Sequence, residues 1–124
     1  QTGSRMLQLL ERRLDNAVHR AGFAVSRRQA RQLVTHGHFM LNGRRVDIPS
    51  IRLKPGDKVT VRPHSQKTEY FKNLAQVSRD ASGQVPGWLK VNVKDMTFDA
   101  TGLPTREDAE PDIKDQLIVE YYSR

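Results

Sequence analysis

The sequence has no cysteine, which excludes disulfide bonds and thiolate metal sites and is compatible with a reducing compartment. Aromatic residues make up only 6% of its 124 residues, and apolar runs are short. Leu117-Ile118-Val119 is among the longest and is far too short to span a bilayer. The polar start shows no signal peptide, and its abrupt opening suggests the remainder of a longer protein. At 36% hydrophobic residues, the chain can form one domain or two small ones around a modest core.

Acidic residues are scarce in the first part of the chain. Residues 1–72 hold 15 Lys and Arg against 5 Asp and Glu, whereas residues 73–124 hold 6 against 9. The formal net charge is +7 and the sequence pI is about 10.1. A basic N-terminal part indicates a nucleic-acid partner, and the acidic remainder indicates a scaffold or a protein-facing surface.

Two helices are expected first. The span 6–21 predicts one helix, since its apolar residues recur every three or four positions, and Gly22 suits a left-handed end. A second helix should begin at Ser26, which forms a capping box with Gln29, and end at Gly37. The apolar residues of the first stripe are Leu7, Leu10, Leu14, Ala17 and Ala21.

A small antiparallel sheet should follow these helices. Asn42-Gly43 separates the extended runs 39–41 and 44–46, and both turn residues tolerate the positive φ of a type I′ hairpin. Phe39 should then lie opposite Val46 on the buried face. A turn at 55–57 precedes a third strand at 59–62, which closes the first unit near Pro63.

The rest of the chain is less regular. Residues 65–79 predict a helix, 80–87 a polar loop and 88–93 a strand. The acidic run 107–112 suits either a solvated loop or a surface facing a basic protein. The apolar run 117–122 is either a buried strand or the last turns of a helix, because its periodicity does not distinguish them.

The arginines form the candidate site. Arg27, Arg28 and Arg31 occupy the first turns of the second helix, where cations oppose the helix dipole, so their presence suggests a use. A solvated face is the ordinary interpretation of one such cluster. Further arginines, nearly uncompensated by acids, favour a surface that binds phosphates and stacks on bases. The hairpin tip can insert into a groove or be a simple turn. The further arginines are Arg12, Arg13, Arg20, Arg44 and Arg45.

Other chemistry has weaker support. His36 and His38 could hold a metal, but no third ligand is evident, and His36 better suits a helix end. Nucleophile elbows, P-loops and dinucleotide fingerprints are missing from the sequence. Arg13-Leu14-Asp15 also occurs around the catalytic aspartate of pseudouridine synthases, although a salt bridge in the first helix is favoured here. Core packing is favoured over base stacking for Trp88, Phe98 and the Tyr121-Tyr122 pair.

These residues resemble the S-four RNA-binding domain and, more specifically, the universal S-four family of bacterial small-subunit ribosomal proteins. The matching segments are 9–16, 20–23, 26–27, 30–34, 36–38, 46–50 and 116–124, with Trp88-Leu89 also in place. The opening Leu-Leu-Glu and the C-terminal ending are the parts most specific to the ribosomal family. The family's basic N-terminal region has no counterpart in this chain, so its contacts, including a zinc site in some relatives, are not carried over.

The resemblance implies an α+β fold in which two helices and a small antiparallel sheet, at 12–63, are inserted into a mainly helical second lobe with a short C-terminal strand pair. Residues 1–11 and 64–124 would form that lobe. It implies a non-enzymatic binder of small-subunit ribosomal RNA that nucleates assembly and influences decoding accuracy. No cofactor or metal is expected. The residues expected at RNA are Arg12, Arg13, Arg20, Ser26, Arg27, Arg28, Arg31, Gln32, His36, His38, Asn42, Arg44, Arg45, Lys54 and Arg62.

The resemblance also implies partners and a location. The neighbours would be other ribosomal proteins, ribosomal protein S-five among them, and mRNA where it enters the subunit, within a cytoplasmic or organellar ribosome and away from membranes. One alternative is a stand-alone S-four factor in ribosome recycling or quality control. The other is a fragment of an RNA-modifying enzyme such as a pseudouridine synthase, for which 124 residues leave no catalytic domain.

Overall fold

The computed structural model describes residues 2–81 and 83–105 of the chain. Helices and strands occur in separate runs within them, which confirms the expected α+β class, and no helix in this part is long and apolar enough to cross a membrane. The elements are α1 (Thr2–Glu11), α2 (Leu14–Arg20), α3 (Arg27–Thr35), β1 (Phe39–Leu41), β2 (Arg44–Val46), β3 (Lys58–Val61), α4 (Pro63–Gln66), α5 (Glu69–Lys72), α6 (Leu74–Asp80), β4 (Leu89–Asn92) and β5 (Thr97–Ala100).

The strands form one antiparallel sheet with the order β2-β1-β3-β5-β4. Phe39 lies opposite Val46, as the hairpin pattern predicted, and the turn residues Asn42 and Gly43 have φ values of 52° and 84°. Strand β5 pairs with β3, so Phe98 lies beside Val59 in the same sheet. The later part of the chain therefore extends the sheet that the hairpin begins.

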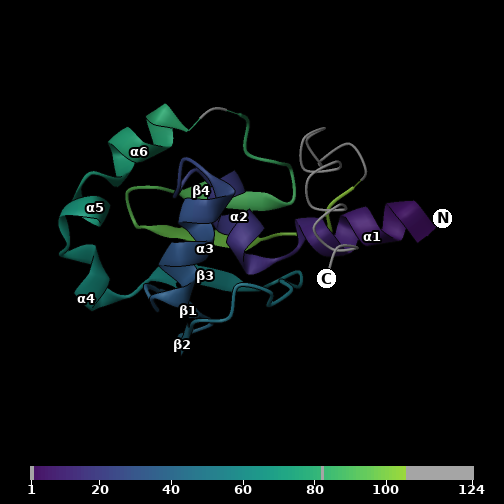
Figure 1. Cartoon of the computed structure of the whole chain (residues 1–124), viewed down its shortest axis with the longest axis horizontal. Coiled ribbons are helices and arrows are strands. Elements are labelled where there is room, and N and C mark those ends of the chain that lie inside the picture. Colours follow the sequence, from purple (N-terminus) through teal and green to yellow (C-terminus); the bar gives the residue numbers. More distant parts are fainter. Residues whose placement is uncertain (1, 82, 106–124) are drawn as a thin grey trace.

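Helices α2 and α3 lie across one face of the sheet, α1 extends to one side, and α4 to α6 follow its opposite end (Figure 1). The core between helices and sheet is fully buried and contains Leu14, Phe23, Val34, Phe39 and Phe98. The rings of Phe23 and Phe98 meet edge to face, with centroids 5.4 Å apart. This packing fixes α3 on the sheet and turns its other face outward.

The prediction of one helix over 6–21 is wrong, because the chain breaks after α1. Arg13 is extended, with φ −60° and ψ 142°, and forms an isolated antiparallel bridge with Arg52. Around the break, Leu14 N–H donates to the Ile51 carbonyl at 2.7 Å, and Leu53 N–H donates to the Arg12 carbonyl at 2.9 Å. Backbone bonds to a distant segment thus replace helical bonds at this point.

The prediction of one helix over 65–79 is also wrong, since three short helices occupy this region. Thr68 is extended, with φ −74° and ψ 156°, and Asn73 leaves helical geometry with φ −99° and ψ 19°. These breaks let the segment fold around the body and bury Phe71 and Leu74. The Tyr70 hydroxyl donates to the Phe23 carbonyl at 2.7 Å, which attaches α5 to the loop before α3.

The expected core roles of Trp88 and Phe98 are confirmed, as both side chains are buried. The indole Nε1 of Trp88 donates to Glu11 Oε2 at 3.1 Å. The Tyr121-Tyr122 pair, the acidic run 107–112 and the apolar run 117–122 lie outside the described residues.

Candidate nucleic-acid interface

Helix α3 presents a polar stripe to solvent. Ser26 Oγ accepts a hydrogen bond from Gln29 N–H at 3.1 Å, and Gln29 Oε1 accepts from Val25 N–H at 2.9 Å, so the predicted cap forms with the return bond one residue earlier. Ala30 and Val34 are buried against the core. The opposite positions, spaced three and four apart, are exposed and share one face. They are Arg28, Arg31, Gln32 and Thr35, and we call them the α3 stripe.

Arg27 lies beside this stripe and differs from it. Its side chain is half-buried, and its Nε and Nη2 atoms are shielded from solvent. Ser26 is exposed, but its hydroxyl oxygen already caps the helix. At the N-terminal end of α3, Arg28 is therefore more available to a partner than Arg27 or Ser26.

The C-terminal end of α3 gathers a second group of cations. His36 is the C-cap residue, as predicted, and is followed by the left-handed Gly37 with φ 77°. Arg62 Nη1 donates to the Gly37 carbonyl at 3.0 Å, and the guanidinium of Arg45 lies against the same glycine. Residues from α3, β2 and the end of β3 thus meet at one turn. Cations suit this position because the helix dipole is negative at its C-terminus.

His38 lies within this group and is partly buried. Its Nδ1 is 2.8 Å from Ser65 Oγ, and its ring packs on Phe71 with centroids 5.6 Å apart. Burial lowers the pKa of His38 below 6.5, and the positive charges of His36, Arg62 and Arg45 lower it further. The ring therefore tends to stay neutral beside its cationic neighbours. Among the described residues, no group of three His, Cys, Asp or Glu side chains could hold a metal ion.

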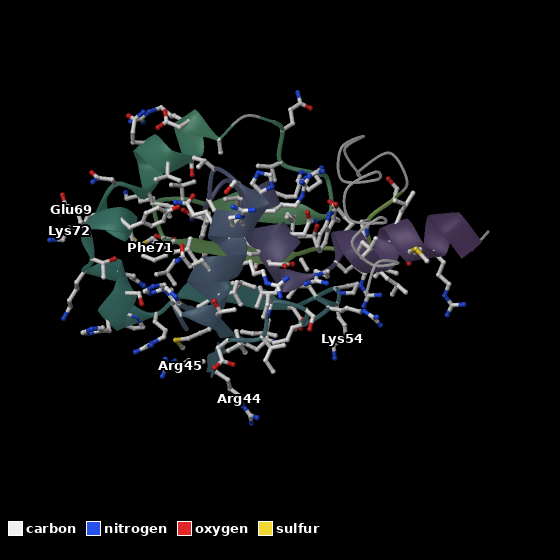
Figure 2. The ribbon with its side chains drawn as sticks, in the orientation of Figure 1. Arg44, Arg45, Lys54, Glu69, Phe71 and Lys72 are labelled. Carbon is white, nitrogen blue, oxygen red and sulfur yellow. The ribbon has the colours of Figure 1, made fainter. Side chains whose placement is uncertain are left out.

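The hairpin carries two more exposed arginines. Arg44 and Arg45 project from the lower edge of the view, and Lys54 lies along that edge towards α1 (Figure 2). Asn42 has an internal role: its Nδ2 donates to Asp57 Oδ1 at 2.9 Å, and its Oδ1 accepts from Lys58 N–H at 2.8 Å. Asn42 therefore holds the turn, while the arginines point outward.

The predicted residues near the α1–α2 junction are engaged in the fold. Arg12 Nε donates to the Leu53 carbonyl at 2.8 Å, and Arg13 pairs with Asp15 through two bonds of 3.1 Å, the predicted salt bridge. Arg20 is buried, with its Nε 3.7 Å from Glu11 Oε2. Arg20 is therefore not a candidate for contact with RNA, because a buried guanidinium cannot reach a macromolecule at the surface.

Three of the five acidic residues in positions 1–72 are withdrawn from the surface of the basic region. Glu11 and Asp57 are buried, and Asp15 is half-buried in its pair with Arg13. Asp47 and Glu69 are exposed, and Glu69 lies on α5 at the left edge of Figure 2, well away from Arg44 in this view. The α3 stripe and hairpin thus carry a concentrated positive charge, which attracts polyanions.

The sequence pattern did not select some residues of this region. Thr35 completes the α3 stripe, and Gly37 contacts Arg45, although neither carries a charge that composition would reveal. Arg5 and Arg52 are exposed cations near the α1–α2 junction. Together with Arg13 they flank a hollow of about 290 Å³ whose remaining lining is Met6, Leu9, Leu10 and Ser50. The bridge between Arg13 and Arg52, which creates this neighbourhood, has no local sequence signal.

Comparison with known proteins agrees with this arrangement. Residues 12–59 match the S4 domain, so the helices and hairpin described above belong to that class of module. The chain is 52% identical over 124 residues to small ribosomal subunit protein uS4 of Roseiflexus castenholzii, covering 100% of this chain and 60% of the relative. The protein of the same name from Clostridioides difficile is 52% identical over 122 residues, covering 98% and 58%. That from Chloroflexus aurantiacus is 50% identical over 123 residues, covering 99% and 60%.

Over its whole length the chain is similar to the uS4 family of small ribosomal subunit proteins. It spans about 60% of the length of these relatives. The S4 domain match contains all of α2, α3 and the hairpin, and thus every residue of the candidate interface except Arg62.

Proposed function

We propose that this chain is the part of a structural small-subunit ribosomal protein that binds ribosomal RNA, without catalytic activity. The names of its relatives support a place in the small ribosomal subunit. The observation that carries the proposal is the exposed α3 stripe, whose Arg28 and Arg31 lie on the helix that ends at the cations around Gly37. We define the interface as the α3 stripe with His36, His38, Arg44, Arg45 and Arg62.

The interface suits recognition of shape and phosphate. Arginine binds phosphate through two parallel N–H donors and stacks on unpaired bases, and RNA is read largely through its backbone and loops. Contacts to phosphate position a protein on folded RNA. If about five phosphates are neutralised, the logarithm of affinity should fall with the logarithm of salt concentration at a slope of roughly −3.5 to −4.5.

More specific partners and roles are proposed from the resemblance of the sequence to the universal S-four family. The protein would bind small-subunit RNA early, help nucleate assembly of the subunit and influence decoding accuracy. Its neighbours would include ribosomal protein S-five and mRNA where it enters the subunit. Its location would be the ribosome of the cytoplasm or of an organelle.

Reversal of two stripe charges tests the proposal. Arg28→Glu with Arg31→Glu should weaken binding to small-subunit ribosomal RNA by about 100-fold or more, because two charge-assisted contacts are lost and two repulsions gained. Helical circular dichroism should stay unchanged, since both side chains are exposed. The matched control is Lys72→Glu with Arg79→Glu on α5 and α6, which changes net charge equally at exposed sites.

Filter-binding titrations of both double variants against small-subunit and large-subunit RNA give the answer. Equal losses in the two variants would show that only net charge matters and would remove the α3 stripe from the interface. A preference of the unaltered chain for large-subunit RNA would contradict the proposal and favour a stand-alone S4 factor.

A further inference from the structure

Gly37 is a contact point for three separate parts of the chain. It is buried, its N–H donates to the Val34 carbonyl at 2.9 Å, and its φ of 77° is left-handed. Its carbonyl accepts from Arg62 Nη1 at 3.0 Å, and the next carbonyl, that of His38, accepts from Arg62 N–H at 2.8 Å. Arg62 therefore holds the turn through both its backbone and its side chain.

The third part is the hairpin, through Arg45. A Cβ atom placed on Gly37 would lie 2.5 Å from Nη2, 2.8 Å from Nε and 3.0 Å from Cζ of Arg45. These three atoms belong to one planar guanidinium, so this plane occupies the space that any side chain at position 37 would need. At Gly43 and Gly56, which also have positive φ, a Cβ would meet nothing within 4 Å. The close approach at Gly37 is therefore not a general consequence of left-handed geometry.

This arrangement places the Arg45 guanidinium against the end of α3 while the residue stays exposed. Arg45 is on the edge strand β2 and remains exposed, so its guanidinium can contact the protein and still meet an external group. Two guanidinium groups converge here despite their repulsion, because the C-terminus of α3 carries negative partial charge. Restricting a binding group in advance reduces the entropy lost when a ligand binds.

We propose that Gly37 is a positioning residue for RNA binding: its missing side chain lets the Arg45 guanidinium rest beside the end of α3, where Arg45 meets a backbone phosphate. Arg62 acts with Gly37 by holding the turn in place. The inference rests on the proposed function, since RNA is the ligand. The inference goes beyond that function in one respect: the uncharged Gly37 sets the position of the charged Arg45.

Substitution of Gly37 should therefore act on RNA through Arg45. Gly37→Ala should reduce affinity for small-subunit ribosomal RNA by about tenfold, the effect of one lost charge-assisted bond. The salt slope should become shallower by about 0.7 to 0.9, since one phosphate contact is lost. Gly56→Ala is the matched control, because it imposes similar backbone strain with open space around the new methyl group. It should leave affinity and salt slope unchanged.

Two further variants keep the test decisive if alanine at position 37 impairs folding. Gly37→Asn introduces the same Cβ with less strain, because asparagine tolerates left-handed geometry. Arg45→Ala removes the group that is displaced, so adding Gly37→Asn to Arg45→Ala should change affinity less than twofold. Melting temperatures of all variants, measured without RNA, separate folding from binding.

The outcomes distinguish the two proposals. Losses at Gly37 that equal those at Gly56, or that add in full to the loss from Arg45→Ala, would overturn the positioning role and leave the interface standing. Unchanged binding in the double stripe variant, Arg28→Glu with Arg31→Glu, would overturn the interface itself.

Discussion

The α1–α2 junction and the outer face of α3 are both rich in arginine but use it differently. At the junction, Arg12 donates to a backbone carbonyl, Arg13 pairs with Asp15, and Arg20 is buried beside Glu11. On α3, Arg28 and Arg31 are exposed on the side opposite the core. The residue type is the same, and its surroundings decide whether it stabilises the fold or faces a partner.

The difference depends on the acids and carbonyls that lie within reach. Glu11 is buried and accepts hydrogen bonds from Asn16 Nδ2 at 2.9 Å and from Trp88 Nε1 at 3.1 Å, besides its pairing with Arg20. Helix α3 contains no acidic residue in its sequence. Two of the three arginines on this helix therefore stay exposed, whereas those accompanied by acids at the junction are engaged in the fold.

Removal of Glu11 should produce the largest change in stability. Glu11→Ala leaves Arg20 as a buried charge without its carboxylate and should lower the free energy of unfolding by about 3–5 kcal/mol. Urea denaturation followed by circular dichroism measures the change. Asp47→Ala, at an exposed acid, should stay within about 0.5 kcal/mol of the unaltered chain. Equal losses of stability in Glu11→Ala and Asp47→Ala would contradict a special stabilising role of the buried Glu11.

Arginine truncation in each region should separate stability from binding. Arg12→Ala removes the donor to the Leu53 carbonyl and should lower the free energy of unfolding by about 1–3 kcal/mol. Arg31→Ala should change stability by less than about 0.5 kcal/mol and weaken RNA binding by about tenfold. Denaturation and filter binding on both variants test the contrast. It fails if Arg31→Ala destabilises the chain as much as Arg12→Ala.

Substitution of Ser26 should sharpen the boundary of the interface within α3. Ser26→Ala removes the acceptor for Gln29 N–H and should cost about 1 kcal/mol, whereas Ser26→Gly should cost only a few tenths. If Ser26 acts only as a cap, both variants should keep the affinity for RNA. Weaker binding in both at constant salt, with the salt slope unchanged because the hydroxyl carries no charge, would show that the hydroxyl also meets the RNA.

Local signals predicted the elements nearest the interface well. The capping pair Ser26 and Gln29, the helix end at Gly37 and the Asn42-Gly43 turn all act through bonds within a few residues. Periodicity also identified the apolar positions buried along the span 6–21, although α1 and α2 divide it: Leu7, Leu10, Leu14, Ala17 and Ala21 are all buried. These features depend on nearest neighbours, so a single sequence contains them.

Features that depend on distant contacts were not predictable in the same way. The α1 break at Arg13 depends on a bridge to Arg52, and the burial of Arg20 depends on the position of Glu11 in a separate helix. The contact between Gly37 and Arg45 requires the hairpin to fold back beside α3. Charge alone therefore did not reveal which arginines near the junction are engaged in the fold, nor that an uncharged residue lies against Arg45.

The smallest expected effects are those of pH, first on the stability of the free chain and then on its affinity for RNA. Burial and the charges of His36, Arg62 and Arg45 lower the pKa of His38 in the folded chain below its unfolded value of 6.5. Between the two pKa values the unfolded chain binds more protons, so this contribution to stability is present above pH 6.5 and is lost as the pH falls through the lowered pKa of the folded chain. Urea midpoints at pH 7.5 and 5.5 should show this loss in the unaltered chain and less of it in His38→Gln.

The affinity for RNA should depend on pH in the opposite direction to the stability of the free chain. A phosphate beside Arg45 and Arg62 offsets the charges that lower the pKa of His38, so the complex binds a proton more readily than the free protein. Affinity at constant salt should therefore rise modestly as the pH falls from 7.5 to 6, and His38→Gln should flatten that rise. A rise of equal size in His38→Gln would assign the proton to another group, and no rise in the unaltered chain would place the phosphate away from the Gly37 turn.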